Sequence, residues 1–501
     1  MNQSLKIEVN DNRNYRLWFI GMLGCCAVLY FATISRNGFW YDEVMTALAG
    51  RLPFGEMILD RTTHGHLPLF FILSWIWQHF VGESEIVLRF FPVLLGLASA
   101  CLLFLIVDKL TDAKTGFWAA LMLLLNPEHI AVAQFARMYT LLLFIALCAI
   151  FLIIISEKEP RWQHRAGLYV LLSLLLYTHY SSLFVFSALI AYLLVRRRPC
   201  WKLGFSGLLA VLTFLPWLVY AFDKITVQSN LSLLRPYHIL ESVALWVKVS
   251  GTIQIFSYEE MMGGSIVLPA LISLSTVSIS VWATINARYQ GRLFAILVIF
   301  PIMAVSVMGF LGLPNFPSIT RYFITLVAAQ AALFAIGLIY ADVSYQKARM
   351  AAMLFLLVMN VGGTVGYFYN ENGCFGHLKS GWRETAQTIE ALGGPSERTY
   401  FVGGNNGSTT LKYYYSGEIL NINALAKRWA KGEDLGPPSW ENKRLLKAFE
   451  LTPETTGCWL YVATRNRLQK EELEFIHILK QLMHEREEVP TQRGVLMHFQ
   501  R

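Results

Sequence analysis

Two adjacent carboxylates, Asp42 and Glu43, stand shortly after the first apolar run of the chain. That run, from Leu17 to Ile34, consists almost entirely of apolar residues. Acidic side chains beside a membrane carry a cost in free energy, so their position there indicates a function. A carboxylate within hydrogen-bond reach of a hydroxyl or amine can act as a general base. The pair is therefore a candidate for acid–base chemistry at the lipid–water boundary.

Arginines and other polar side chains recur at the ends of later apolar runs. Arginine offers a rigid fork of donors that suits a phosphate, and it can stabilise the negative charge that grows on a leaving phosphate. One carboxylate base and one or more arginines suffice for an inverting displacement. The candidate phosphate ligands are Arg89, Arg137 and Arg321, and the candidate substrate contacts are His64, His66, Glu128, Gln134, Tyr139, His179, Tyr180 and Tyr322.

Each candidate also has a purely structural interpretation. Acids favour the first turn of a helix, so Asp42 and Glu43 could cap the helix that follows, with or without a catalytic role. An arginine at the end of a span can anchor that span to lipid head groups. His64 and His66 could chelate a metal, but no clear third ligand accompanies them, so a divalent metal is not favoured. His179 could equally be a packed residue at a turn.

The composition indicates a membrane protein. The chain has 501 residues, of which 55% are hydrophobic and only 15% are charged. Several apolar runs approach the roughly 20 residues that a helix needs to cross a bilayer. The net charge of +8 resides in short loops between these runs, as the positive-inside rule expects, and there is no basic patch interleaved with aromatic residues. Nucleic acid is therefore excluded as a partner.

The loop charges set a topology of about eleven spans, with the N-terminus inside and the C-terminus outside. The run from Leu67 to Val81 is short for a span, and a crossing there would turn every later basic loop outward. We therefore expect it to lie against the outer face. Residues 166–195 are expected to form a hairpin of two short spans, with Thr178–Ser182 at its outer tip. The expected spans lie near 17–34, 90–110, 116–135, 138–156, 166–180, 181–195, 203–222, 264–284, 293–312, 322–340 and 349–368.

Two further outer segments are expected to be folded. An amphipathic run from Val44 to Asp60 follows the carboxylate pair, and Tyr237–Val249 reads as an amphipathic helix on the membrane surface. After Phe368 the composition becomes that of a soluble α/β domain of roughly 130 residues. Its expected elements are helices at 382–392, 411–415 and 471–484, strands at 399–402 and 458–463, and a turn at Gly403–Gly404.

The same polar region contains two cysteines, Cys374 and Cys458, which could form a disulfide if this part lies outside the cytoplasm. The tyrosine run 413–415 reads as packing rather than binding.

Several motifs together resemble the bacterial GT-C glycosyltransferases of family 39, the group of protein mannosyltransferases and aminoarabinose transferases. Their order and spacing carry the resemblance, which is strong over 36–145 and weak over the last 130 residues. The motifs are Phe39–Glu43, His64–Leu69, Gly82–Glu85 with Arg89, Gln134–Tyr139, Thr178–Tyr180, Arg321–Tyr322 and Trp382–Glu384.

The resemblance implies an integral-membrane transferase that uses a polyprenyl-phosphate-linked sugar. It assigns Asp42 as the catalytic base with Glu43 assisting, places Arg89 on the donor phosphate, and matches Arg137 to an Arg-Met-Tyr element. This branch does not generally need a metal. One departure is that the usual His-Pro-Pro-Leu reads His66-Leu67-Pro68-Leu69, which puts the role of His66 in doubt.

The sequence thus predicts a polytopic α-helical membrane protein of GT-C type over 1–368, with a first external loop at 35–89 and an extracytoplasmic α/β domain over 369–501. The expected function is an inverting glycosyl transfer to a lipid, glycan or protein acceptor at the outer face of a bacterial plasma membrane. The alternatives are a transporter or flippase of a lipid-linked glycan and a receptor. Apolar span centres disfavour transport, because transporters usually carry polar groups midway through the membrane.

Overall fold

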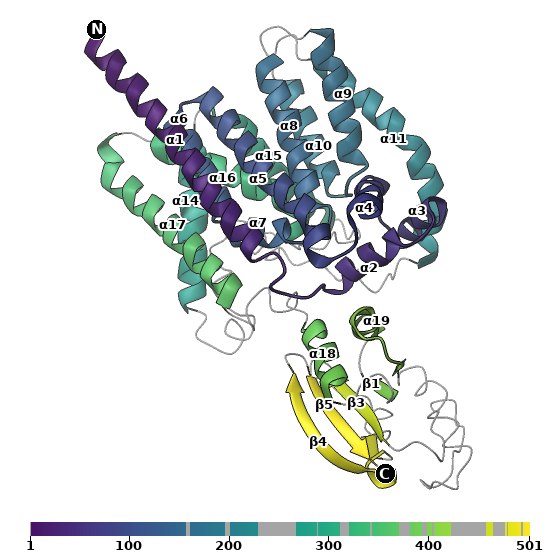
Figure 1. Ribbon diagram of the computed structural model, residues 1–501. Coiled ribbons are helices and arrows are strands. Elements are labelled where there is room, and N and C mark those ends of the chain that lie inside the picture. Colours follow the sequence, from purple (N-terminus) through teal and green to yellow (C-terminus); the bar gives the residue numbers. More distant parts are fainter. Residues whose placement is uncertain are drawn as a thin grey trace. The chain divides into compact units, whose positions relative to one another are not determined.

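The chain divides into two compact units, each described by itself below. The first comprises Met1–Ile34 with Thr46–Gly376, and the second comprises Ser35–Met45 with His377–Arg501. The computed structural model describes residues 2–156, 161–195, 201–228, 267–287, 289–310, 320–340, 343–369, 381–392, 398–402, 405–421, 457–463, 476–477, 479–491 and 494–500 (Figure 1).

The first unit is a bundle of helices, and every expected span coincides with a helix or a helix pair (Figure 1). Within the described residues, six helices are long and apolar enough to cross a membrane, or seven if one bent pair counts as a span. The predicted polytopic helical architecture is therefore confirmed. The helices are α1 (Asn2–Ala32), α2 (Tyr41–Gly50), α3 (Phe54–Thr63), α4 (Pro68–Val81), α5 (Glu85–Leu110), α6 (Ala113–Leu124), α7 (Pro127–Ala133), α8 (Tyr139–Ser156), α9 (Trp162–Leu176), α10 (Ser182–Val195), α11 (Trp201–Gln228), α14 (Val267–Asn286), α15 (Arg292–Phe310), η2 (Thr320–Phe323), α16 (Ile324–Ile339), η3 (Val343–Tyr345) and α17 (Gln346–Tyr369).

The bent pair is α6 and α7, which meet at 66° where one continuous span is expected. Asn126 interrupts the helix, and its side-chain oxygen accepts a hydrogen bond from Glu128 N at 2.9 Å. Pro127 occupies the first position of α7, where its missing N–H is not needed. The cap and the proline together start a new helix in a new direction.

Helices α1 and α5 run antiparallel. At one end, Arg16 Nη2 lies 2.9 Å from Asp108 Oδ2, and at the other end Arg89 Nη1 donates to the Ile34 carbonyl at 2.9 Å. The end of α1 and the start of α5 therefore lie at the same end of the bundle. This agrees with the expectation that the apolar run at 67–81, which forms α4, does not add a crossing.

The expected amphipathic run at 44–60 divides into two short helices, α2 and α3. The chain bends at Pro53, whose extended backbone precedes the first turn of α3. The hairpin expected at 166–195 is present as α9 and α10, which are joined through a turn at Tyr177–Ser181.

The second unit contains a five-stranded sheet with the order β2-β1-β3-β5-β4. The first three strands are parallel, and β5 and β4 add an antiparallel hairpin. The elements are α18 (Trp382–Leu392), β1 (Arg398–Val402), α19 (Asn405–Tyr414), β2 (Ile419–Asn421), β3 (Gly457–Ala463), β4 (His484–Thr491) and β5 (Gly494–Gln500).

Alternation along the strands builds a core on both faces of this sheet. Tyr400 and Leu460 pack on one face, whereas Phe401 and Tyr461 pack on the other, against Trp382 of α18. The α/β character and the expected helix at 382–392 are therefore confirmed, as are the expected strands.

One boundary expected for this unit is wrong. His484 begins β4 rather than ending a helix, because it pairs in register with Gln500 of β5. The expected turn at 403–404, the surface helix at 237–249 and Cys374 lie outside the described residues. Cys458 is buried, with its Sγ 3.6 Å from Met483 Sδ, and the disulfide stays a prediction.

Residues 35–45 fall in the second unit, although the sequence groups the whole first loop with the spans. Phe39 N donates a hydrogen bond to the Tyr414 hydroxyl, and Arg383 Nη1 donates to the Ser35 carbonyl at 3.1 Å. The ring of Tyr413 lies 5.8 Å from that of Phe39. The tyrosine run therefore packs, as expected, and its packing partner is the segment that carries the carboxylate pair.

Candidate functional site

A first group of charged and aromatic side chains lies where α3 turns into α4. The guanidinium of Arg61 lies 5.6 Å from the centre of the Phe71 ring, and the His66 ring lies 5.3 Å from the same ring. Arg61 is only 2% exposed and pairs with the neighbouring Asp60, whose Oδ2 accepts from Nε at 2.7 Å. A buried cation thus lies beside an aromatic ring at the start of α4.

Arg137 connects this group to the turn between α7 and α8. Its guanidinium also lies 5.6 Å from the centre of the Phe71 ring, and its side chain is 2% exposed. Its Nη1 donates to Thr46 Oγ1 at 3.4 Å. An arginine of α3 and an arginine of the turn between α7 and α8 therefore approach one aromatic ring, an arrangement that attraction between cations and rings stabilises.

A second aromatic group continues from Arg137. The ring of His179 lies 5.9 Å from Tyr139 and 4.9 Å from Tyr322, and the two tyrosine rings are 6.0 Å apart. The guanidinium of Arg321 lies 5.6 Å from the centre of the Tyr322 ring. We call the whole set the arginine cluster. It consists of Arg61, His66, Phe71, Arg137, Tyr139, His179, Arg321 and Tyr322.

The two histidines of the cluster are buried and lie near arginines, and both features lower their pKa values. Burial lowers the pKa of His66 well below its ordinary value, and Arg137 and then Arg61 lower it further. Burial, Arg137 and Arg321 lower the pKa of His179 to about 3. Both imidazoles are therefore neutral near pH 7, and the cluster is suited to an anion.

The cluster joins candidates that lie far apart in the sequence. It contains His66, Arg137, Tyr139, His179, Arg321 and Tyr322, which come from four separate segments of the chain. The structure brings these side chains together, and their roles in binding remain predictions.

Sequence reasoning missed Arg61 and Phe71. Arg61 sits in the amphipathic run beside Asp60, a pattern typical of a solvated ion pair, and Phe71 sits in an apolar run. Only the fold of α3 against α4 turns them toward Arg137.

Other candidates make contacts that join helices. Arg89 is buried and donates to the Ile34 carbonyl, which fixes the end of α1 to the start of α5. Gln134 Nε2 donates to the Tyr30 carbonyl at 3.0 Å and to Thr33 Oγ1 at 2.7 Å. Its Oε1 accepts from the Tyr367 hydroxyl at 3.0 Å, so Gln134 joins α1, α7 and α17.

The remaining candidates are spread around the same turns. Glu128 and His129 are buried in α7, and His129 Nδ1 lies 3.0 Å from the Tyr30 hydroxyl. His64 is exposed, with its Nδ1 2.7 Å from the carbonyl oxygen of Asp60. Tyr180 stands next to His179, and burial raises the pKa of its hydroxyl to about 12.

The carboxylate pair occupies the first turn of α2. Glu43 is fully buried, and its Oε2 accepts a hydrogen bond from Trp40 N at 3.4 Å. This is the reach-back contact of a capping box, so the capping interpretation applies to Glu43. Asp42 is half-buried. In the part of the chain that the structure describes, no group of three or more His, Cys, Asp or Glu side chains is arranged to hold a metal ion.

Comparison with known proteins adds two findings. Residues 64–220 match the family model of dolichyl-phosphate-mannose-protein mannosyltransferases. The whole chain superimposes on ArnT from Cupriavidus metallidurans in the apo state, with a TM-score of 0.58, 12% identity and coverage of 97% of this chain and 98% of ArnT. ArnT bound to undecaprenyl phosphate gives a TM-score of 0.56 at 11% identity, again with 97% and 98% coverage.

Two further results delimit this likeness. The archaeal oligosaccharyltransferase AglB from Archaeoglobus fulgidus, in complex with an inhibitory peptide and a dolichol-phosphate, gives a TM-score of only 0.47 at 12% identity. It covers 89% of this chain and 69% of AglB, and no inference rests on it. No curated protein sequence matches the chain. The likeness to ArnT over nearly the full length confirms the predicted fold, which is that of the GT-C membrane glycosyltransferases.

Proposed function

We propose that this multi-pass membrane protein is an inverting glycosyltransferase that takes a sugar from a polyprenyl-phosphate donor. The observation that carries the proposal is the arginine cluster, which gathers three guanidinium groups and two neutral imidazoles around aromatic rings. The partial match to the mannosyltransferase family model and the ArnT fold support the same reaction class.

Arg137 is the central ligand of the donor phosphate in this proposal. Its guanidinium lies 5.6 Å from the centre of the Phe71 ring, and Arg137 and Arg321 both act electrostatically on His179. Guanidinium donors bind phosphate oxygens in pairs and stabilise the charge that grows as the phosphate leaves. Arg89 has a hydrogen bond that joins α1 to α5, so we assign it a supporting role instead of direct phosphate binding.

Asp42 is the proposed base. The family resemblance supports Asp42 over Glu43, whose Oε2 accepts the capping hydrogen bond from Trp40 N.

The reaction then follows a single displacement. The acceptor hydroxyl or amine gives its proton to the Asp42 carboxylate, and the freed electron pair attacks the anomeric carbon of the sugar. The bond from that carbon to the phosphate oxygen breaks, and the polyprenyl phosphate leaves with an added negative charge on the guanidinium groups. The neutral histidines and the tyrosines of the cluster supply hydrogen bonds to sugar hydroxyls.

The acceptor is a lipid, glycan or protein, and the proposed location is the outer face of a bacterial plasma membrane, with the N-terminus in the cytoplasm. No cofactor enters this scheme. The C-terminal unit is proposed to be extracytoplasmic, as the loop charges predict.

The test uses purified protein in liposomes with a radiolabelled polyprenyl-phosphate sugar and an extract of bacterial membranes as acceptor source. We expect a labelled glycosidic product with wild type, and none with Asp42→Asn at unchanged melting temperature. Movement of intact donor across the bilayer without a product would contradict the proposal and favour a flippase.

A further inference from the structure

The segment 35–40 leads directly into the carboxylate pair, and it forms neither a helix nor a strand. Its backbone groups therefore need partners from other parts of the chain. Residues 35–45 belong to the second unit, and helices α18 and α19 of that unit supply the partners. The two contacts join residues that are 348 and 375 positions apart in the sequence.

Arg383 of α18 holds the start of this segment. Its Nη1 donates to the Ser35 carbonyl at 3.1 Å, and its Nη2 donates to the Arg36 carbonyl at 3.3 Å. The same Nη2 lies 2.9 Å from Glu384 Oε1, and this charged pair restrains the guanidinium. The rigid fork of one arginine thus fixes two successive carbonyls.

Tyr414 of α19 holds the other end of the segment. Its hydroxyl accepts a hydrogen bond from Phe39 N, and the Phe39 side chain is fully buried. The next residue is Trp40, whose carbonyl accepts from Glu43 N at 2.9 Å and from Val44 N at 3.1 Å. Trp40 is therefore the N-cap of α2, and Phe39 directly precedes it. The contact with Tyr414 fixes the point at which the chain enters the first turn of α2.

Both holding residues stand on a closely packed base. Helices α18 and α19 pack on one face of the sheet, in a core that includes Trp382, Phe401 and Leu411. The ring of Trp382, which is next to Arg383, lies 5.8 Å from that of Phe401. Helix α19 approaches the sheet so closely at Gly407 that a Cβ there would lie 2.7 Å from Phe401 Cζ. Such packing leaves the two helices little freedom to shift.

We propose that Arg383 and Tyr414 are positioning residues for glycosyl transfer, and that the second unit contributes to the reaction by holding the segment that carries Asp42. The inference rests on the proposed function, because it takes Asp42 as the base. A base must lie within hydrogen-bond reach of the proton that it removes, and a displacement of about 1 Å can cost about 100-fold in rate. Asp42 lies in the first turn of α2, so a shift at Phe39 would move its carboxylate.

The test combines initial rates of transfer with hydrogen exchange of the peptide 37–45, both measured on the full chain in detergent. Tyr414→Phe removes only the hydroxyl that accepts from Phe39 N, and Arg383→Gln removes the fork. Either variant can replace the other if one fails to fold. We expect kcat to fall about 10- to 100-fold while KM for the donor stays within about twofold of wild type. The peptide should exchange about 3- to 10-fold faster, as the loss of a hydrogen bond implies.

Conservative and matched variants separate positioning from general damage. Arg383→Lys should recover part of both losses, because its ammonium can still reach one carbonyl. Tyr415→Phe makes the same change as Tyr414→Phe one residue later, where the hydroxyl accepts from Thr399 Oγ1 at 3.5 Å. Lys412→Gln removes an exposed cation of α19 and is the control for Arg383→Gln. Both controls should match wild type in kcat and in exchange of the peptide.

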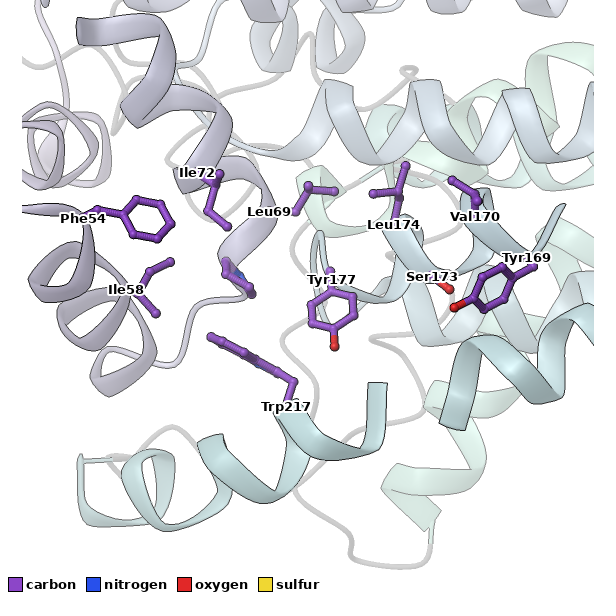
Figure 2. Close-up of a pocket in the computed structure, with 11 residues that line it drawn as sticks. Phe54, Ile58, Leu69, Ile72, Tyr169, Val170, Ser173, Leu174, Tyr177 and Trp217 are labelled. Carbon is purple, nitrogen blue, oxygen red and sulfur yellow. The ribbon is translucent and has the colours of Figure 1, made fainter. Parts of the chain in front are cut away.

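A further variant tests whether loss of stability alone exposes the segment. Ile72 lines an apolar cavity of about 550 Å³ in the first unit, together with Leu174 and Trp217 (Figure 2). Ile72→Ala widens this cavity and should lower the melting temperature. The peptide 37–45 should still exchange as it does in wild type. Exchange as fast as in Tyr414→Phe would contradict a specific hold by the second unit.

The outcomes separate this inference from the proposed function. Wild-type exchange and wild-type kcat in both Tyr414→Phe and Arg383→Gln would overturn the inference. Faster exchange with wild-type kcat would also overturn it and would leave Asp42 as the base. Equal losses of kcat in the variants and their matched controls would overturn it as well, because they would indicate general damage. Absence of transfer by wild type would overturn the proposed function, and the positioning role would fall with it.

Discussion

Two groups of buried polar side chains lie near the same end of the helical bundle, and they are held in different ways. In the first group, Arg89 and Gln134 donate to backbone carbonyls and a hydroxyl of neighbouring helices, at distances from 2.7 to 3.0 Å. In the second, Arg61, Arg137 and the half-buried Arg321 lie over aromatic rings, although Arg61 also pairs with Asp60 and Arg137 also donates to Thr46 Oγ1. The first group joins α1 to α5, α7 and α17, whereas the second comes together around the rings of Phe71 and Tyr322.

The difference suggests a rule for telling structure from function in such a bundle. A hydrogen bond to another helix uses a polar atom to fix the fold, and its loss leaves a buried group unsatisfied. Attraction to an aromatic ring stabilises a guanidinium through its charge, without using an N–H donor in that contact. Substitutions in the first group should therefore lower stability more than transfer. Substitutions in the second group should lower transfer more than stability.

The largest effect is expected for Arg137. Arg137→Gln should lower the rate of transfer by about 100-fold or more, because it removes a donor aimed at the growing charge on the phosphate. Arg137→Lys keeps the charge but loses the fork, and it should recover only part of that loss. The measurement is product formation per folded molecule, with the melting temperature as the check on folding. Full activity in Arg137→Gln would remove Arg137 from the site.

Gln134 should give the opposite pattern. Gln134→Ala leaves the Tyr30 carbonyl and the hydroxyls of Thr33 and Tyr367 without these partners, which should cost roughly 2–4 kcal/mol of stability. Transfer per folded molecule should stay near that of wild type. Thermal unfolding in detergent together with initial rates tests this, and a variant that is stable but inactive would move Gln134 into the functional group.

Phe71 is expected to have an intermediate effect on transfer. Phe71→Leu removes the ring that Arg61 and Arg137 share, and attraction of that kind contributes about 0.5–2 kcal/mol per pair. We expect transfer to fall about 3- to 30-fold, with the larger change in KM for the donor. Phe90→Leu is the matched control, since Phe90 packs against Phe31 and Trp77. Equal losses in both variants would argue against a specific role for the shared ring.

His179 gives the smallest effect, on the pH dependence of stability. Its pKa of about 3 in the folded chain lies below the ordinary 6.5, so the unfolded chain binds this proton more readily. Its contribution to stability is complete above about pH 6.5 and is lost as the pH falls toward 3. His179→Gln lacks this term, so its melting temperature should fall less steeply than that of wild type between pH 6 and pH 4. Parallel curves would contradict the assignment.

Much of the membrane architecture is predictable from the sequence, because length and apolarity define spans. Length and apolarity do not predict breaks within a span. Asn126 and Pro127 divide one expected span into two helices that meet at 66°. Loop charge alone predicts that the short run at 67–81 does not cross the membrane. The contact of Arg89 with Ile34 agrees with that prediction.

The site was predictable only in part. Arg137, His179 and Arg321 stand at boundaries between apolar runs, and motifs of a known family single them out. Arg61 and Phe71 carry no such signal, because a charge next to Asp60 reads as solvated and a phenylalanine in an apolar run reads as core. Arg89 also stands at such a boundary and donates to the Ile34 carbonyl, and direct phosphate binding by Arg89 stays a prediction from the sequence.

The central claim is that the arginine cluster holds the phosphate of a prenyl phosphate lipid. The most direct measurement is the equilibrium binding of undecaprenyl phosphate to wild type, Arg137→Gln and Arg89→Gln, with each variant compared at equal folded fraction. We expect binding at least about tenfold weaker for Arg137→Gln, because a charge-assisted pair is lost, and nearly unchanged binding for Arg89→Gln. Equal affinity of wild type and Arg137→Gln would contradict it.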